Sequence, residues 1–388
     1  MRRVRWHLAG AERATPAGVK LSLRSSLFCG LFVFCLSVPP AHSYSVLAHQ
    51  AIIDAAWDDA IVPLLRQRYP GITQDTLDTA RAFAYGGSVI QDLGYYPFGS
   101  RRFTNLVHYV RSGDFVEALI TEAQSPEELA FALGGLAHYA CDNFGHPLAT
   151  NRVVPLMYPK VREEVGERAL YADSPARHVM VEFAFDVLHV AGSGYSAEAF
   201  RQRIGFEVSK PLLERAFRKT YGLELTNLFG DEDLAIGTYR HAISTLIPEI
   251  TRLAWEDKQD EIRKKTPDAV QEKFVFSLTP ADYDKEYGTE YRKPGLFTRI
   301  VFYILKIVPK VGPFRPLAFE PLTPEAEKLF VQSFETARDR YRGWVLTLRK
   351  SPISLPNSDL DTGESPNPAE NPLVAETNEE FAKLKVAK

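Results

Sequence analysis

The sequence predicts an all-α fold. Apolar residues recur at helical spacing along most of the chain, as Leu129, Leu133 and Leu136 do. Segments of alternating polar and apolar residues, which would indicate strands, are few, and no internal repeat is evident. With 388 residues, of which 45% are hydrophobic, the chain is long enough to bury one large core or two smaller ones.

The first 43 residues are typical of an export signal. Residues 1–26 carry six basic side chains and one acidic side chain, and residues 27–38 form an apolar stretch too short to span a bilayer. Small residues, Ala41 and Ser43, stand three positions and one position before the expected cut. We therefore predict a signal peptide over residues 1–43 and a secreted or periplasmic mature chain beginning at Tyr44, with a retained anchor as the alternative.

Removal of this segment changes the charge and the cysteine content. The mature chain keeps 40 basic and 48 acidic side chains, a net charge of −8, which disfavours a nonspecific polyanion binder. Cys141 is the one cysteine of three that remains, so the mature chain cannot form an intramolecular disulfide. An exported domain without disulfides must rely on its core, and bound metal can assist it.

Helical patterns follow one another along the mature chain. Ser125 opens one helix as the N-cap, with Pro126 in the first turn and Glu128 closing a capping box, and Pro147 marks its predicted end. Ser174 opens a second helix, again followed by proline. The other predicted helices cover residues 47–60, 74–87, 102–118, 198–218, 232–256 and 324–349.

Two later segments differ from these helices. Residues 296–311 are strongly apolar but interrupted by three basic side chains, a pattern that suits either a buried helix or a helix at a membrane interface. Residues 351–388 are rich in Pro, Asn, Ser and Glu and predict a disordered tail. The helical domain is therefore predicted over residues 44–350.

Histidines and carboxylates with the spacing of metal ligands recur on two of the predicted helices. His138, Asp142 and His146 are four residues apart and would share one helix face. His178 and Glu182 form a second pair with the same spacing. Zinc accepts imidazole nitrogen and carboxylate oxygen, although surface ion pairs produce the same spacing, so one pair alone would be weak evidence. Several pairs together predict a multinuclear zinc site.

Further candidate ligands lie outside these two helices. Asp92 and His108 flank an aromatic, turn-rich loop at residues 93–99, which is suited to placing ligands beside the helices. His49 lies five residues after the predicted new N-terminus at Tyr44. A free α-amino group can ligate a metal once it is deprotonated.

With these residues in this order, the sequence resembles the zinc-dependent phospholipase C family, which shares its fold with the fungal-type zinc single-strand nucleases. The resemblance implies an all-helical domain with three zinc ions, in which the first mature residue is itself a ligand. The matching residues span 44–182, the ligand-bearing part of the predicted domain. The implied ligands are Asp92, His108, His138 and Asp142 for the first zinc; Asp142, His49 and the amino nitrogen and carbonyl oxygen of Tyr44 for the second; and His146, His178 and Glu182 for the third.

Two positions depart from the family pattern. Tyr44 stands where the family usually has Trp, a change compatible with ligation because the ligating atoms belong to the backbone. His146 follows Asp142 by four residues, whereas the family usually places this ligand about two residues further on. A helix-end histidine before Pro147, without a metal, is the alternative interpretation of His146.

Phosphodiester hydrolysis is the activity that such a site favours. Zinc ions lower the pKa of bound water and neutralise a phosphate. The resemblance implies attack by a metal-activated water, with Asp92 orienting or deprotonating it. Tyr95, Tyr96 and Phe98 could line the entrance, where they would contact a lipid, a choline headgroup or a base, or they could simply pack in the core.

The substrate is less sharply indicated than the metal. Glu182 ends the helical pair as in the phospholipases, where the nucleases usually have Asp, and the nucleases are typically disulfide-bonded. The short spacing from Tyr44 to His49 is instead shared with the nucleases. The sequence therefore predicts a secreted phospholipase C-type phosphodiesterase acting on phospholipid or a membrane surface. The alternatives are a zinc-dependent single-strand nuclease, with nucleic acid as the less favoured partner, and a zinc-binding protein without turnover.

Overall fold

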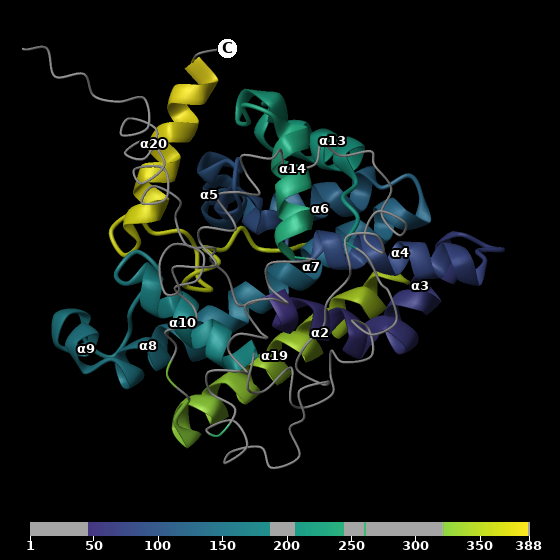
Figure 1. Cartoon of the computed structure of the whole chain (residues 1–388). Helices are drawn as coiled ribbons and strands as arrows, with labels where there is room; N and C mark the ends of the chain where they lie inside the picture. Colours follow the sequence, from purple (N-terminus) through teal and green to yellow (C-terminus); the bar gives the residue numbers. More distant parts are fainter. Residues whose placement is uncertain (1–45, 187–205, 244–259, 261–319, 321, 387–388) are drawn as a thin grey trace, which may run out of the picture. The chain divides into compact units, whose positions relative to one another are not determined.

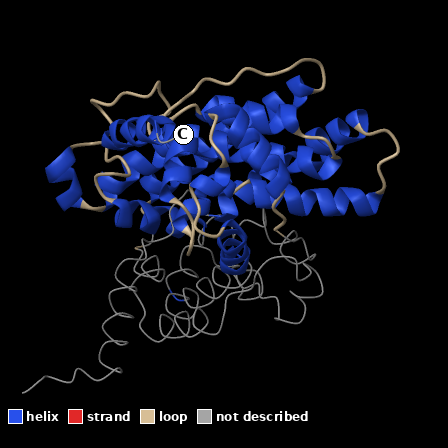
Figure 2. Cartoon of the chain, turned by 90° about the horizontal axis from the view of Figure 1, so that it is seen from above, coloured by secondary structure: helices blue, strands red, loops and turns tan. Residues whose placement is uncertain are grey.

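A computed structural model describes residues 46–186, 206–243 and 322–386, with the single residues 260 and 320. Within these ranges every regular element is a helix, and the secondary-structure view contains helices and connecting loops (Figures 1 and 2). The predicted all-α class is therefore confirmed. The elements in chain order are α2 (Val46–Ala56), η1 (Trp57–Ile61), α3 (Val62–Arg68), α4 (Gln74–Gly87), η2 (Ile90–Tyr95), α5 (Arg101–Tyr109), α6 (Ser112–Glu122), α7 (Pro126–Gly145), η3 (His146–Thr150), α8 (Asn151–Met157), α9 (Pro159–Val165), α10 (Pro175–Phe185), α13 (Lys210–Tyr221), η5 (Leu225–Asn227), α14 (Glu232–His241), α19 (Pro324–Leu348) and α20 (Pro372–Val386).

Side-chain caps fix where several helices begin. The hydroxyl of Ser125 accepts the amide N–H of Glu128 at 3.2 Å, as the capping box predicts, and Pro126 occupies the first turn of α7. The hydroxyl of Thr73 accepts the N–H of Thr76 at the start of α4, and Thr323 caps α19 in the same way. Each of these caps satisfies an amide that the helix itself leaves unpaired.

Helix α7 is packed on several sides by other helices of the described part. It contacts α2, α4, α6 and α19, and Figure 1 shows α2 and α19 along one side of it. Glycines allow its close approach to α4, because a Cβ at Gly134 would collide with the carbonyl oxygen of Ala84, and one at Gly87 with the carbonyl oxygen of Phe131. Close packing here brings the end of α4 to the histidine face of α7.

Three predicted boundaries are wrong; one is the start of the helix predicted over residues 198–218, because α13 begins at Lys210. The helix expected over residues 102–118 is broken into α5 and α6, because Arg111 adopts the left-handed conformation at φ 58° and helical hydrogen bonding cannot continue through it. Pro147 does not end the chain of helical turns. It lies at the start of a wider π-helical turn, η3, which runs on into α8, and a proline near the start of a turn sacrifices few hydrogen bonds.

The structure also corrects the disordered tail predicted over residues 351–388. Leu355, Leu360 and Val374 are buried, and the segment ends in α20, which packs against α5. The polar side chains that suggested disorder find partners instead, since the amide of Asn371 donates to the Asp359 carboxylate at 2.9 Å. Polar composition predicts disorder only where such partners are missing.

The predicted signal peptide, residues 1–43, and the apolar residues 296–311 lie outside the described residues, as do residues 198–205 and 244–256 of two predicted helices. Among the helices that are described, none has the length and apolar character needed to cross a bilayer.

Candidate metal centre

The predicted ligands come from different helices and are brought to one buried region. Tyr44 lies outside the described residues. All of the others are nearly or fully buried, the most exposed being His146 at 8%. They are His49 on α2, Asp92 on η2, His108 on α5, His138 and Asp142 on α7, His146 on η3, and His178 and Glu182 on α10.

The first group joins η2, α5 and α7. His108 Nε2 lies 3.4 Å from Asp92 Oδ1 and 3.3 Å from Asp142 Oδ2. His138 Nε2 lies 3.0 Å from the same oxygen of Asp142 and 3.9 Å from Asp92 Oδ1. Ligand atoms of Asp92, His108 and His138 all lie within 4.8 Å of one another, a separation that one metal ion can bridge.

The protonation of these two rings is constrained by their outer nitrogens. His108 Nδ1 lies 2.8 Å from the carbonyl oxygen of Thr104, and His138 Nδ1 lies 3.1 Å from that of Ser88. A carbonyl oxygen can only accept, so each Nδ1 carries the hydrogen, and in a neutral ring Nε2 then holds a lone pair. The two Nε2 atoms are 3.2 Å apart. Two facing lone pairs would repel, so the pair requires either a proton or a metal ion between the two nitrogens.

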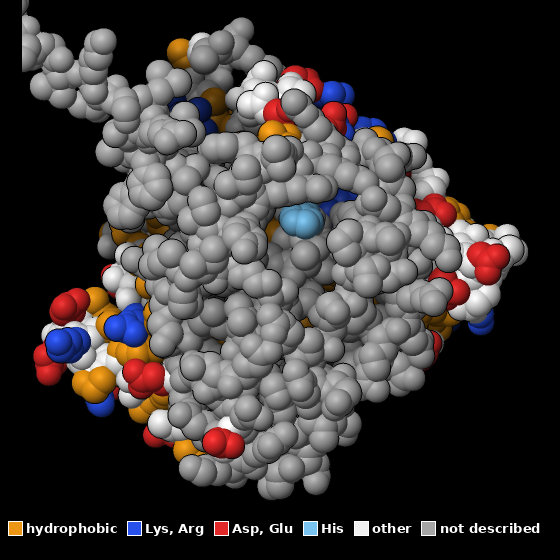
Figure 3. All heavy atoms as spheres, viewed as in Figure 1, with side chains coloured by type: hydrophobic (Ala, Val, Ile, Leu, Met, Phe, Trp, Pro, Cys, Tyr) orange, Lys and Arg blue, Asp and Glu red, His pale blue; other side chains and the backbone are white. Residues whose placement is uncertain are grey.

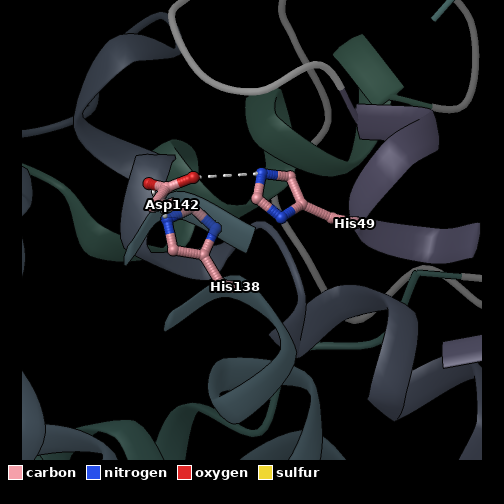
Figure 4. Close-up of side chains that lie close together, drawn as sticks. All are labelled: His49, His138 and Asp142. Carbon is pink, nitrogen blue, oxygen red and sulfur yellow. Dashed lines mark ion pairs between the residues drawn. The ribbon is translucent and has the colours of Figure 1, made fainter. Parts of the chain in front are cut away.

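The second group shares Asp142 with the first. His49 Nε2 lies 3.7 Å from Asp142 Oδ1 (Figure 4). The His49 ring also stacks on that of His138, with centroids 4.5 Å apart. Asp142 thus turns one oxygen toward His49 and the other toward His108 and His138. A carboxylate with its oxygens divided in this way has the arrangement required of a bridging ligand.

The third set is more loosely assembled than the first two groups. His146 Nε2 lies 3.5 Å from Glu182 Oε1 and 3.9 Å from Asp142 Oδ1. His178 donates from Nε2 to the carbonyl oxygen of Ala169 at 2.8 Å, which leaves its buried Nδ1 as the nitrogen with the lone pair. The four-residue spacing therefore brings His146 to the residue pair on α10.

Without a metal, the charges of the centre are balanced by protons. Burial lowers the pKa of His108, but the carboxylates of Asp142 and Asp92 together raise it to about 10. Burial raises the pKa of Asp142, yet the surrounding histidines hold it well below its usual range. Burial also raises the pKa of Glu182 well above its usual range. Bound cations would replace these protons, so metal binding should release protons.

We predict that rising pH destabilises the metal-free protein more than the zinc-loaded protein. His108, with a folded pKa raised to about 10, contributes stability below its unfolded pKa near 6.5 and loses that contribution as pH rises through 10. Glu182, whose pKa is also raised, acts in the same direction. The unfolding temperature of chelator-treated protein should therefore fall between pH 7 and 10, while zinc should hold it up. Identical thermal profiles with chelator and with zinc would contradict a buried metal centre.

Asp186 also supports the centre, although its role was not predicted from the sequence. Its carboxylate accepts the amide N–H groups of Leu47 and Ala48 at 2.8 and 3.1 Å, and so caps the start of α2, the helix that carries His49. Asp186 follows Glu182 by four residues, so the helical spacing could have revealed it.

Two of the three aromatic side chains in the loop at residues 93–99 pack in the core. Tyr95 and Tyr96 are buried, with the Tyr95 ring 6.5 Å from that of His108 and the Tyr96 ring 5.1 Å from that of Tyr239. Phe98 differs, being 43% exposed with a left-handed φ of 64°. Of the three aromatic side chains, Phe98 alone is placed to meet a ligand from solvent.

Fold and site together define an all-helical domain with a buried centre of histidines and carboxylates suited to binding metal. A family model described as zinc dependent phospholipase C matches residues 48–230. Residues 48–230 therefore match the zinc-dependent phospholipase C family, the family that the sequence was expected to resemble. The match includes all the predicted ligands except Tyr44. Neither the curated proteins nor the solved structures gave a match to this chain.

Proposed function

We propose that this chain is a zinc-dependent hydrolase that cleaves the phosphodiester of a phospholipid, as a phospholipase C does. The observation that carries this proposal is that the Nε2 atoms of His108 and His138 face each other. The Nδ1 atom of each ring contacts a backbone carbonyl oxygen, so Nε2 is the nitrogen left to bind a metal. The carboxylates of Asp92 and Asp142 lie beside these Nε2 atoms. Such carbonyl contacts are how metal-ligating histidines are usually oriented. The family match supports a phospholipid as the substrate class.

Three zinc positions are proposed from the side chains that lie together. Zinc, when bound, supplies a Lewis acid that lowers the pKa of water and neutralises phosphate. The first set is Asp92, His108, His138 and Asp142; the second is Asp142, His49 and the backbone of Tyr44; the third is His146, His178 and Glu182.

Asp92 is the proposed general base. Its carboxylate is 1% exposed, and neither oxygen accepts a hydrogen bond within the described part of the chain. Oδ1 faces the Nε2 atom of His108, which leaves Oδ2 to accept a hydrogen bond from the attacking water. Thr104 helps to position both His108 and Asp92. Its carbonyl oxygen contacts Nδ1 of the His108 ring, and its hydroxyl donates at 2.7 Å to the carbonyl oxygen of Gln91, the residue before Asp92.

The net charge predicted for the mature chain favours lipid over nucleic acid. Where described residues reach the surface visible in Figure 3, both acidic and basic side chains are present. Nonspecific nucleic-acid binding depends on clustered basic side chains that neutralise phosphates. We also propose that the chain is exported and cut before Tyr44, which would give the mature chain a net charge of −8.

The direct test uses protein that begins at Tyr44 and is loaded with zinc. We expect it to release a phosphorylated headgroup from phosphatidylcholine vesicles, to lose this activity with chelator and to regain it with zinc. The variant Asp92→Asn should lower turnover by about 100-fold or more, because a general base contributes about that much. Cleavage of single-stranded DNA without headgroup release would make the protein a nuclease, and zinc binding without turnover on either substrate would make it a binding protein.

A further inference from the structure

The segment predicted to be a disordered tail reaches the metal centre through one carboxylate. We propose that Asp361 is a positioning residue, which orients the His146 ring so that Nε2 faces the third zinc position. This inference rests on the proposed zinc centre and adds to it a residue from outside the matched range, residues 48–230.

The two nitrogens of His146 face different carboxylates. Nε2 lies 3.5 Å from Glu182 Oε1, on the side of the other ligands, whereas Nδ1 lies 3.8 Å from Asp361 Oδ1. The imidazole ring therefore stands between Asp361 and the other ligands. This arrangement suits Asp361 as a partner of the ring rather than as a further ligand.

Asp361 is held firmly in this place. It is 2% exposed, its Oδ2 accepts the amide N–H of Tyr171 at 2.9 Å, and its carbonyl oxygen accepts the side-chain amide of Asn151 at 2.7 Å. Its Oδ1, by contrast, is buried and accepts no hydrogen bond from the described residues. A buried carboxylate oxygen that accepts no hydrogen bond destabilises the fold. Its position beside the His146 ring therefore indicates a functional role.

The loop around Asp361 is tied to the metal centre at a second point. Asp359 Oδ1 accepts the N–H of Asp361 at 2.9 Å, and the Asp359 carbonyl oxygen accepts the N–H of Gly363 at 2.8 Å, which closes a tight turn. Between them, Leu360 donates its N–H to the carbonyl oxygen of His108 at 3.1 Å. The loop is thus anchored to the backbone of one proposed ligand while its carboxylate faces another.

The other histidines show what such a partner does. His108, His138 and His178 each place one ring nitrogen against a backbone carbonyl oxygen, which fixes both ring orientation and tautomer. His146 has Asp361 in the equivalent place. At 3.8 Å the contact is longer than a hydrogen bond, and a shift of the ring by about 1 Å would close it to the 2.7–2.9 Å of a charge-assisted bond. A carboxylate also makes the ring a stronger ligand than a carbonyl would.

The test is the isosteric substitution Asp361→Asn in the full mature chain. Zinc affinity, measured by competition with a chromophoric chelator, should fall 10- to 100-fold for one of the bound ions, the usual cost of removing such a partner. The unfolding temperature of the metal-free variant should stay the same or rise, since a buried carboxylate has been neutralised. A residue that merely held the loop together would lower that temperature. Glu364→Gln, which removes an exposed carboxylate from the same loop, should leave zinc affinity unchanged.

A double-mutant cycle shows whether Asp361 acts through His146. In a His146→Ala background the added Asp361→Asn substitution should change zinc affinity less than twofold, because the ring it orients is gone. Equal losses in both backgrounds, or unchanged affinity in Asp361→Asn alone, would overturn the inference. Either result would leave the proposed function standing provided that the unsubstituted protein binds zinc; failure of that protein to bind zinc would reject both.

Discussion

The substitution Asp142→Ala should remove two zinc ions at once and lower headgroup release by about 100-fold or more. Asp142 turns Oδ1 toward His49 at 3.7 Å and Oδ2 toward His138 at 3.0 Å, so its loss deprives two ligand sets of a shared member. Loss of a residue that only orients a metal ligand lowers affinity or activity by about 10- to 100-fold. Loss of a ligand shared by two ions should therefore lower them by at least the upper value. The measurement is zinc content by elemental analysis after dialysis, together with turnover.

A neighbouring residue supplies the matched control. Cys141 is fully buried on the same helix and carries a free thiol. The substitution Cys141→Ala should leave the zinc content at its full value, with at most a small loss of stability. If Asp142→Ala lost one ion, or no more than Cys141→Ala, then Asp142 would not be a bridge.

The second large effect concerns the new N-terminus. Protein carrying one extra residue before Tyr44 should bind one zinc at least tenfold more weakly and lose activity to a similar extent. The extra peptide bond converts the amine of Tyr44 into an amide, which cannot ligate, and moves the amine about 3.8 Å along the chain. Leu47, three residues after Tyr44, donates its N–H to the Asp186 carboxylate at 2.8 Å.

Two controls isolate the backbone from the side chain. Tyr44→Ala in correctly cut protein should keep its zinc, because the proposed ligating atoms of residue 44 belong to the main chain. The extended protein should recover zinc affinity when a protease removes the added residue. Full zinc content and activity in the extended protein would show that the N-terminus is not a ligand.

The sequence predicted best where local rules decide the structure. Helical periodicity predicted residues 74–87, and the structure places α4 at Gln74–Gly87. Local rules failed where packing decides. The left-handed Arg111 divides one predicted helix, and the N–H groups of Tyr171 and Leu360 pair with atoms far away in the chain. Composition gave no indication that polar residues 351–371 would be packed against the domain.

The candidate site, too, was predicted from the sequence where local spacing decides and not where packing decides. Four-residue spacing predicted which side chains share a helix face, as with His138 and Asp142 on α7. Spacing does not predict which helices meet, so the combined ligand sets came from the family resemblance. Neither residue spacing nor the family resemblance predicted the groups that contact and orient the ligand side chains. Ser88 contributes through a backbone carbonyl, which any residue type supplies, and Asp361 lies 215 residues beyond His146.

The number of zinc ions in the mature protein is the most direct test of the central claim, that the buried histidines and carboxylates form a multinuclear zinc centre. Protein beginning at Tyr44 should be stripped by chelator, reloaded and weighed intact by native mass spectrometry. The account predicts three zinc ions per chain, falling to one in Asp142→Ala. A chain that takes up no zinc, or binds as much after Asp142→Ala as before, would contradict it.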